Sequence, residues 1–161
     1  MKISVKTITT AGIIAALYVV LTWLTSLFGL ASGVIQVRIS EALCVLPIFT
    51  PAAIPGLFIG CIIANSITGS VLIDIIFGSI ATLIGAIGTR FLRKKPILAL
   101  LPPIVANMII VPIVLIKAYA VEDALWFLIL TVGAGEIISV GILGFLLYTL
   151  IKQRNLEKVL F

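Results

Sequence analysis

The sequence predicts an all-α integral membrane protein, built as one compact bundle of six transmembrane helices with both termini in the cytoplasm. Hydrophobic residues make up 62% of the 161 residues, and charged residues only 11%. Soluble domains usually contain roughly 25% charged residues. The mean hydropathy is +1.37. So few charges cannot cover a surface that faces water, and residues 1–161 are therefore predicted to form a single domain within a bilayer.

The charge balance and the cysteines exclude several classes of function. The formal net charge of +5 comes from basic residues that flank apolar segments, as the cytoplasmic ends of membrane spans require. No basic stripe interleaved with aromatics is present, which argues against nucleic-acid binding. Cys44 and Cys61 are isolated within apolar runs and the chain has no histidine, so neither a metal site nor another cofactor is expected.

The hydrophobic segments divide into long and short helices. The first, Ile8–Leu30, is longer than the 7–15 residues of a signal-peptide core and is read as a span. The next apolar stretch is interrupted by prolines, which end or kink helices. It is therefore predicted to form two short spans with a turn at Thr50-Pro51. The predicted helices after the first are Ile39–Phe49, Ile54–Ile67, Val71–Leu92, Ile97–Ile116 and Ala124–Ile151.

Basic residues set the expected orientation. Lys2 and Lys6, the cluster from Arg90 to Lys95 and the basic C-terminal tail should all lie in the cytoplasm by the positive-inside rule. The chain then has to cross from the outside near Arg38 to the inside near Arg90 through an odd number of spans. Three spans fit this stretch, which supports dividing its proline-broken part into two.

This topology sorts the polar residues by depth. Most of them are expected near the outer ends of helices, and two are expected near the middle of the membrane. The segment Gln36–Glu41 then forms the lip of a cup that opens to the outside above an apolar floor. Ionisable residues at membrane depth are costly and usually functional. The candidate substrate-binding residues are Arg38, Glu41, Asn65, Asp74, Asn107, Lys117 and Glu136.

Each candidate also has a structural interpretation. Arg38 and Glu41 are three residues apart and can pair with each other at the interface, which contributes little when exposed. Asp74 and Lys117 lie at helix ends, where capping and snorkelling are common. Asp74 also shares a helical face with a stripe of small residues and should point inward. Glu136 is the strongest functional candidate, because a carboxylate in mid-span needs a partner.

The sequence does not favour catalysis. No histidine, no serine beside a base and no metal cluster is present, and no P-loop is found, so the usual nucleophilic, acid–base and nucleotide-hydrolysing sites are missing. A membrane-embedded enzyme that uses Asp74 and Glu136 and a self-sufficient secondary transporter or channel both stay open as alternatives. The second lacks a visible inverted repeat.

Several motifs resemble a known family. Span one contains Ala11-x-x-x-Ala15, and the following loop contains Val37-Arg38-Ile39-Ser40-Glu41-Ala42-Leu43. Together with four further motifs, they resemble the QueT family of queuosine-precursor S components, the substrate-binding subunits of energy-coupling factor (ECF) transporters. The resemblance covers essentially the whole chain. The further motifs are Asn65-Ser66-Ile67-Thr68-Gly69, Asp74-Ile75-Ile76-Phe77-Gly78-Ser79, Ala81-Thr82-Leu83-Ile84-Gly85 and Gly135-Glu136.

The resemblance implies a substrate-binding subunit of an ABC-type importer in the bacterial plasma membrane. Its ligand would be a 7-deazaguanine such as preQ1 or preQ0, or another vitamin-like solute, bound from outside beneath the loop after the first helix. Ala11 and Ala15 would dock onto a transmembrane coupling subunit, and two cytoplasmic ATPases would hydrolyse ATP. For a guanine-type edge, Glu41 or Glu136 can accept two adjacent N–H groups. The aromatic candidates for stacking on the ligand are Trp23, Phe77 and Trp126.

Overall fold

The computed structural model describes residues 4–29 and 36–157, and every regular element within them is helical. Four helical segments are long and apolar enough to cross a membrane, which makes this a multi-pass membrane protein. Two shorter apolar helices accompany them. In chain order the elements are α1 (Val5–Leu27), η1 (Ile39–Ile48), α2 (Ala53–Ile67), α3 (Leu72–Phe91), η2 (Leu98–Leu100), α4 (Leu101–Tyr119), α5 (Leu125–Glu136), η3 (Ile137–Gly144) and α6 (Phe145–Gln153).

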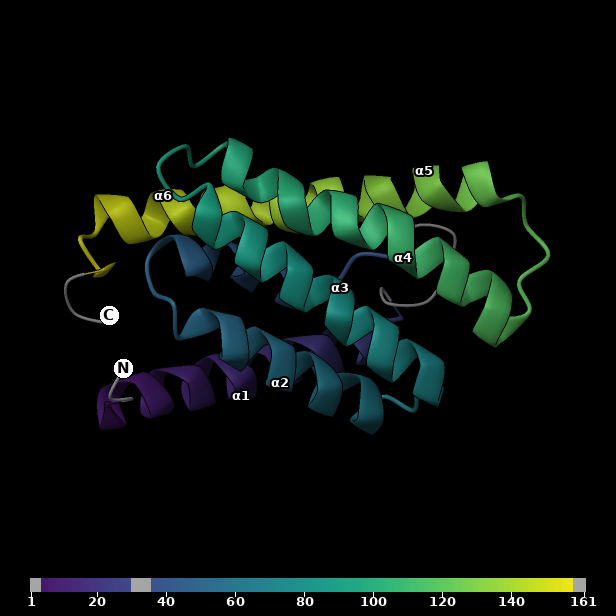
Figure 1. Cartoon of the computed structure of the whole chain (residues 1–161), viewed down its shortest axis with the longest axis horizontal. Helices are drawn as coiled ribbons and strands as arrows, with labels where there is room; N and C mark the ends of the chain where they lie inside the picture. The colour runs from purple at the N-terminus through teal and green to yellow at the C-terminus, as the bar shows by residue number, and fades with distance from the viewer. Residues whose placement is uncertain (1–3, 30–35, 158–161) are drawn as a thin grey trace.

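The predicted helices agree with these elements to within a few residues. The proline-broken stretch does form two short helices, η1 and α2, joined by a turn at Thr50 and Pro51. Each α-helix from α1 to α4 packs beside the next α-helix of the chain, and both ends of the described chain lie at the same end of the bundle (Figure 1). That this end is cytoplasmic stays a prediction from its basic residues. The loop between α1 and η1 lies partly outside the described residues.

The centre of the bundle is η1, which packs against α1, α2, α3, η3 and α6. Its residues from Ser40 to Pro47 are all buried. It is a 3₁₀-helix, so its ten residues span roughly 20 Å, whereas an α-helix of the same length spans roughly 15 Å. This length lets one short segment join the polar half of the bundle, at Glu41, to the opposite end, at Phe49.

Small residues allow close contacts between neighbouring helices. A Cβ atom on Gly60 of α2 would lie 2.9 Å from the Tyr18 Cβ and 3.0 Å from the Ala15 Cα of α1. A Cβ atom on Gly85 of α3 would lie 2.6 Å from the Cα of Pro103 in the first turn of α4. Such contacts between small residues are how helices associate inside a membrane, where lipid is as apolar as the side chains.

Candidate functional site

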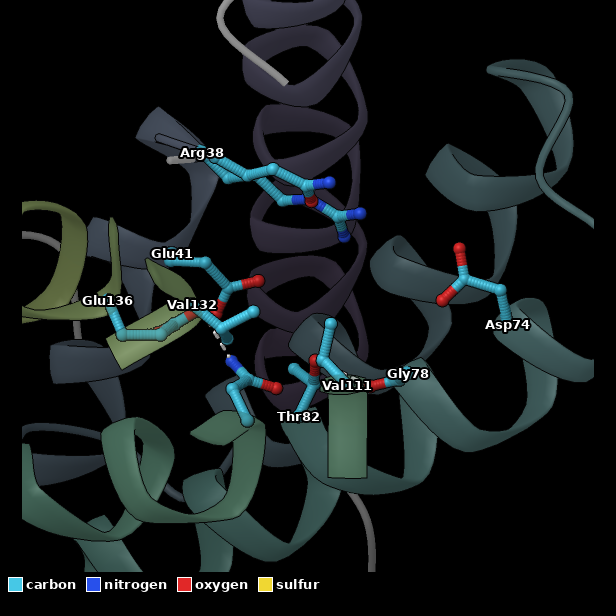
Figure 2. Close-up of a pocket in the computed structure, with 10 residues that line it drawn as sticks. Arg38, Glu41, Asp74, Gly78, Thr82, Val111, Val132 and Glu136 are labelled. Atoms are coloured by element: carbon cyan, nitrogen blue, oxygen red, sulfur yellow. Dashed lines mark hydrogen bonds between the residues drawn. The ribbon is translucent and has the colours of Figure 1, made fainter. Parts of the chain in front are cut away.

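Polar side chains from four segments converge in one half of the bundle. They come from the start of η1, the first half of α3, the middle of α4 and the junction of α5 with η3. Figure 2 shows Glu41 and Glu136 on one side of a cavity, Asp74 on the other and Arg38 above them. The cavity lining consists of Gln36, Arg38, Glu41, Asp74, Gly78, Thr82, Asn107, Val111, Val132 and Glu136.

The inner cavity leads into a wider vestibule. The inner part has a volume of about 20 Å³, enough for roughly one water molecule. The vestibule measures about 360 Å³ and lies toward the α1–η1, α2–α3 and α4–α5 loops. Gln36, Arg38, Asp74 and Val111 line both spaces. A ligand larger than water therefore fits the inner part only if some of its lining side chains move.

Glu41 is held by donors from its surroundings. The Tyr18 hydroxyl of α1 donates to Glu41 Oε1, and Cys44 Sγ lies 3.1 Å from Glu41 Oε2. Glu41 is only 2% exposed. One residue earlier, the Thr22 hydroxyl donates to the Ser40 hydroxyl over 2.8 Å. Both carboxylate oxygens therefore have a protein partner, and these bonds fasten the start of η1 to α1.

Glu136 has a different environment. Asn107 Nδ2 of α4 donates to its Oε1 over 2.9 Å, but Oε2 is buried without a hydrogen-bond partner among the described residues. A buried polar atom left without a partner costs about 1–3 kcal/mol, more when it is charged. Native proteins leave few such atoms, so each one needs an explanation. An oxygen in this state on a cavity wall is suited to accept a donor from a ligand.

The backbone next to Glu136 lies against the segment that precedes η1. A Cβ atom on Gly135 would lie 2.0 Å from the Gln36 carbonyl oxygen, so glycine is required for this close approach. The Arg38 backbone N–H donates to the Ser139 hydroxyl over 3.1 Å. Directly after Glu136 the chain continues as the π-helix η3. Such wide turns inside helices occur often at functional sites.

Arg38 and Asp74 border the vestibule without forming an ion pair with each other. Arg38 Nη1 lies 3.5 Å from Asn65 Oδ1, and Asp74 Oδ2 accepts the Tyr119 hydroxyl over 2.9 Å. The pairing of Arg38 with Glu41 considered from the sequence is also absent from the described residues, since Glu41 is bonded to Tyr18 and Cys44 instead. Three carboxyl groups and one guanidinium thus line the inner cavity.

The structure brings most of the candidate residues together. Arg38, Glu41, Asp74, Asn107 and Glu136 line the inner cavity. Asn65 lies just behind them, 1% exposed, where it contacts Arg38 and Cys61. The inward position of Asp74 predicted from its helical face is confirmed by its 7% exposure.

The remaining candidates lie elsewhere. Lys117 is exposed and borders an apolar groove between α3 and α4, apart from both polar spaces. The aromatic candidates Trp23, Phe77 and Trp126 are 48%, 48% and 66% exposed, and neither polar space is lined by any of them. Tyr119 is the aromatic residue that lines the vestibule.

Sequence reasoning missed Tyr18, Thr82 and Tyr119. Thr82 lines the inner cavity and Tyr119 lines the vestibule. A signal was present for Tyr18, because a phenol in the middle of an apolar span needs a hydrogen-bond partner. The sequence held no comparable signal for the other two, since a threonine hydroxyl inside a helix can bond to the preceding turn, as that of Thr82 does to the Gly78 carbonyl oxygen, and tyrosine is common near the ends of membrane helices.

Comparison with known proteins identifies the family of the chain. A profile of the QueT transporter family matches residues 8–153. The chain belongs to the QueT transporter family. A curated relative, the queuosine precursor transporter QueT of Lactococcus lactis, is 39% identical over 77 residues, which are 48% of this chain and 45% of the relative. The match thus spans less than half of the relative's length. No solved structure shows significant similarity to the chain.

The family match covers almost all of the described bundle. The matched range begins within α1 and ends at the last residue of α6, so it contains all of the polar cavity. The family prediction made from the sequence motifs is therefore confirmed. The polar cavity therefore belongs to a member of a transporter family.

Proposed function

We propose that this chain is the substrate-binding S subunit of an ECF-type importer and that it binds a queuosine precursor of the 7-deazaguanine class. Glu136 carries this proposal, because it lines the cavity and its buried Oε2 has no hydrogen-bond partner among the described residues. A guanine-type edge presents N1–H and an exocyclic amine side by side. One of these donors, placed at Glu136 Oε2, would satisfy the oxygen with a charge-assisted hydrogen bond.

The other lining groups complete the recognition of such a ligand. Asn107 holds Glu136 Oε1 through a 2.9 Å bond and so fixes the direction of Oε2. Gln36 and Arg38 offer donors for the ligand carbonyl, and Val111 and Val132 offer apolar contact for its rings. Asp74 lies across the cavity (Figure 2) and suits the cation of an aminomethyl substituent. Lys117 is left without a ligand contact in this arrangement.

A binding titration tests the proposal. Purified protein is titrated with 7-aminomethyl-7-deazaguanine (preQ1) and 7-cyano-7-deazaguanine (preQ0), with guanine as a control, and the thermal unfolding temperature is followed. Saturable stabilisation by one of the deazaguanines is expected, because a ligand that binds only the folded state stabilises it. A response to a different vitamin-like solute and to neither deazaguanine would contradict the ligand class while keeping the S-subunit role.

The ECF role is tested by transport. Proteoliposomes that contain this chain alone are expected to bind the ligand without accumulating it, since the proposed ATP hydrolysis belongs to two partner ATPases. Addition of a coupling subunit and its ATPases should permit ATP-dependent uptake. Uptake by the chain alone would show a self-sufficient transporter instead. A change in the mass of the ligand would show an enzyme.

Docking onto the coupling subunit is proposed to use α1, with Ala11 and Ala15 in the contact. Ala15 is 8% exposed and packs against Gly60 of α2, so a bulky residue there also disturbs the α1–α2 contact. Ala16, the next residue, is exposed and is proposed to belong to the same contact, so Ala16→Leu tests docking without disturbing the packing of Ala15 against α2. Ala16→Leu is expected to lower ATP-dependent uptake while ligand affinity stays unchanged. The opposite result is normal uptake by Ala16→Leu, with both uptake and ligand binding lost in Ala15→Leu. It would show that the alanines serve to pack the bundle and not to dock the coupling subunit.

A further inference from the structure

The end of the bundle opposite the polar cavity contains a second hollow, formed by three segments that are distant in sequence. It lies between the end of η1, the residues after α3 and the end of α6, and its volume is about 550 Å³. Phe49 and Tyr148 form an aromatic wall, with their ring centroids 5.5 Å apart. We refer to it as the basic hollow, because its charged lining residues are Arg93, Lys94, Lys152 and Glu157.

The charges in the basic hollow do not balance. Lys152 Nζ pairs with Glu157 Oε2 at 2.8 Å and lies 5.7 Å from the centroid of the Phe49 ring. Arg93 and Lys94 are exposed, and neither side chain has a hydrogen-bond or ion-pair partner among residues 4–29 and 36–157. Two positive charges are thus left without an anionic partner among the described residues.

The rim of the basic hollow is firmly held. Arg90 Nη1 donates to the carbonyl oxygens of Pro47 and Ile48 over 3.1 and 3.2 Å, which joins the last turn of α3 to the end of η1. Arg90 is therefore bonded within the protein. Arg93 and Lys94, just beyond the helix, line the hollow without such bonds among the described residues. The cations and the aromatic wall lie next to each other at the end of membrane-spanning helices.

We propose that the basic hollow binds the phosphate headgroup of an anionic membrane lipid. Basic pockets between transmembrane helices are suited to anionic headgroups, and aromatic rings are suited to the membrane interface. Arg93 and Lys94 meet the phosphate, and Phe49 and Tyr148 offer apolar surface to the glycerol and the upper acyl chain. A free phosphate would use the two cations but would gain nothing from the aromatic wall. This proposal is independent of the ligand bound in the polar cavity.

Lipid titration of the full chain tests the proposal. Protein in a neutral detergent is titrated with phosphatidylglycerol, with phosphatidylcholine and with glycerol phosphate, and bound lipid is counted by native mass spectrometry. We expect saturable binding of phosphatidylglycerol that phosphatidylcholine does not match. The double variant Arg93→Gln/Lys94→Gln should lose roughly tenfold or more in affinity, since each basic residue near an anionic lipid contributes about fivefold.

Two control variants distinguish a site from general charge attraction. Lys6→Gln/Lys95→Gln also removes two positive charges, but neither residue lines the hollow, so its affinity should stay within about twofold of wild type. Arg93→Lys/Lys94→Arg keeps both charges and should retain binding if the double Gln variant fails for electrostatic reasons. Equal losses in the two Gln variants, or no preference for phosphatidylglycerol, would overturn the proposal. Displacement of the lipid by equimolar glycerol phosphate would overturn its lipid part.

Discussion

Glu41 and Glu136 are two buried carboxylates on the same side of one cavity (Figure 2), yet their surroundings differ. Glu41 receives the Tyr18 hydroxyl on one oxygen and the Cys44 thiol on the other. Glu136 receives Asn107 on one oxygen only. A fully bonded carboxylate ties two helices together, whereas a half-bonded one on a cavity wall is available to a ligand. From this comparison we propose that Glu41 stabilises the fold and that Glu136 serves binding.

The largest effect is expected when Glu41 is removed. Glu41→Ala leaves the Tyr18 hydroxyl buried without its acceptor and opens space in the centre of the bundle. The loss of unfolding free energy is expected to be about 2–5 kcal/mol, the range for cavities and broken buried polar contacts. Chemical denaturation in detergent measures it. Glu41→Gln keeps an acceptor for Tyr18 and should lose much less free energy of unfolding. Equal losses in the two variants would show that the hydrogen bond to Tyr18 does not explain the effect.

The second effect concerns the loop that lies against α5. Gly135→Ala places a Cβ atom where the Gln36 carbonyl oxygen now lies, so the loop or the helix has to shift. Forced shifts of this kind cost about 1–3 kcal/mol. We expect weaker ligand binding as well, because Gln36 and Arg38 line the cavity. Gly141→Ala is the control, since its nearest neighbour would be an ordinary 3.7 Å contact. A similar affinity in both variants would show that the close approach is not needed for binding.

The third prediction separates binding from folding at Glu136. Glu136→Gln keeps the size of the side chain but loses the charge, and ligand binding should weaken by more than about 1 kcal/mol if Oε2 makes a charge-assisted bond. Stability without ligand should not fall, because a buried amide costs less than a buried carboxylate. Isothermal titration and thermal unfolding measure the two quantities. Unchanged affinity together with lower stability would reverse the roles assigned to Glu41 and Glu136.

The smallest effect is expected at Lys117. This residue borders the apolar groove between α3 and α4 and not the polar cavity. Lys117→Gln should therefore leave ligand affinity within about 0.5 kcal/mol of wild type, as is usual for surface substitutions. The same titration that measures Glu136→Gln provides the comparison. A loss of ligand affinity as large as that of Glu136→Gln would show that Lys117 takes part in binding.

Much of the architecture follows from local patterns in the sequence. Runs of apolar residues predict the helices, and prolines predict the division of the second stretch into η1 and α2. The type of helix that a segment forms depends less on its local sequence. Neither the 3₁₀ form of η1 nor the π form of η3 was predicted, because both depend on how these segments pack against each other and against their neighbours.

The sequence by itself determined the membrane class, the positions of the helices, the family and five of the ten residues that line the inner cavity. Only the tertiary structure decided which polar groups are already bonded. Tyr18 and Glu41 are 23 positions apart, and Asn107 and Glu136 are 29 apart, so no local pattern reports either contact. Hydropathy places a carboxylate at a depth in the membrane, but its role depends on the donors that other helices bring to it. For Glu136 the described helices supply a hydrogen-bond donor to only one of its two oxygens.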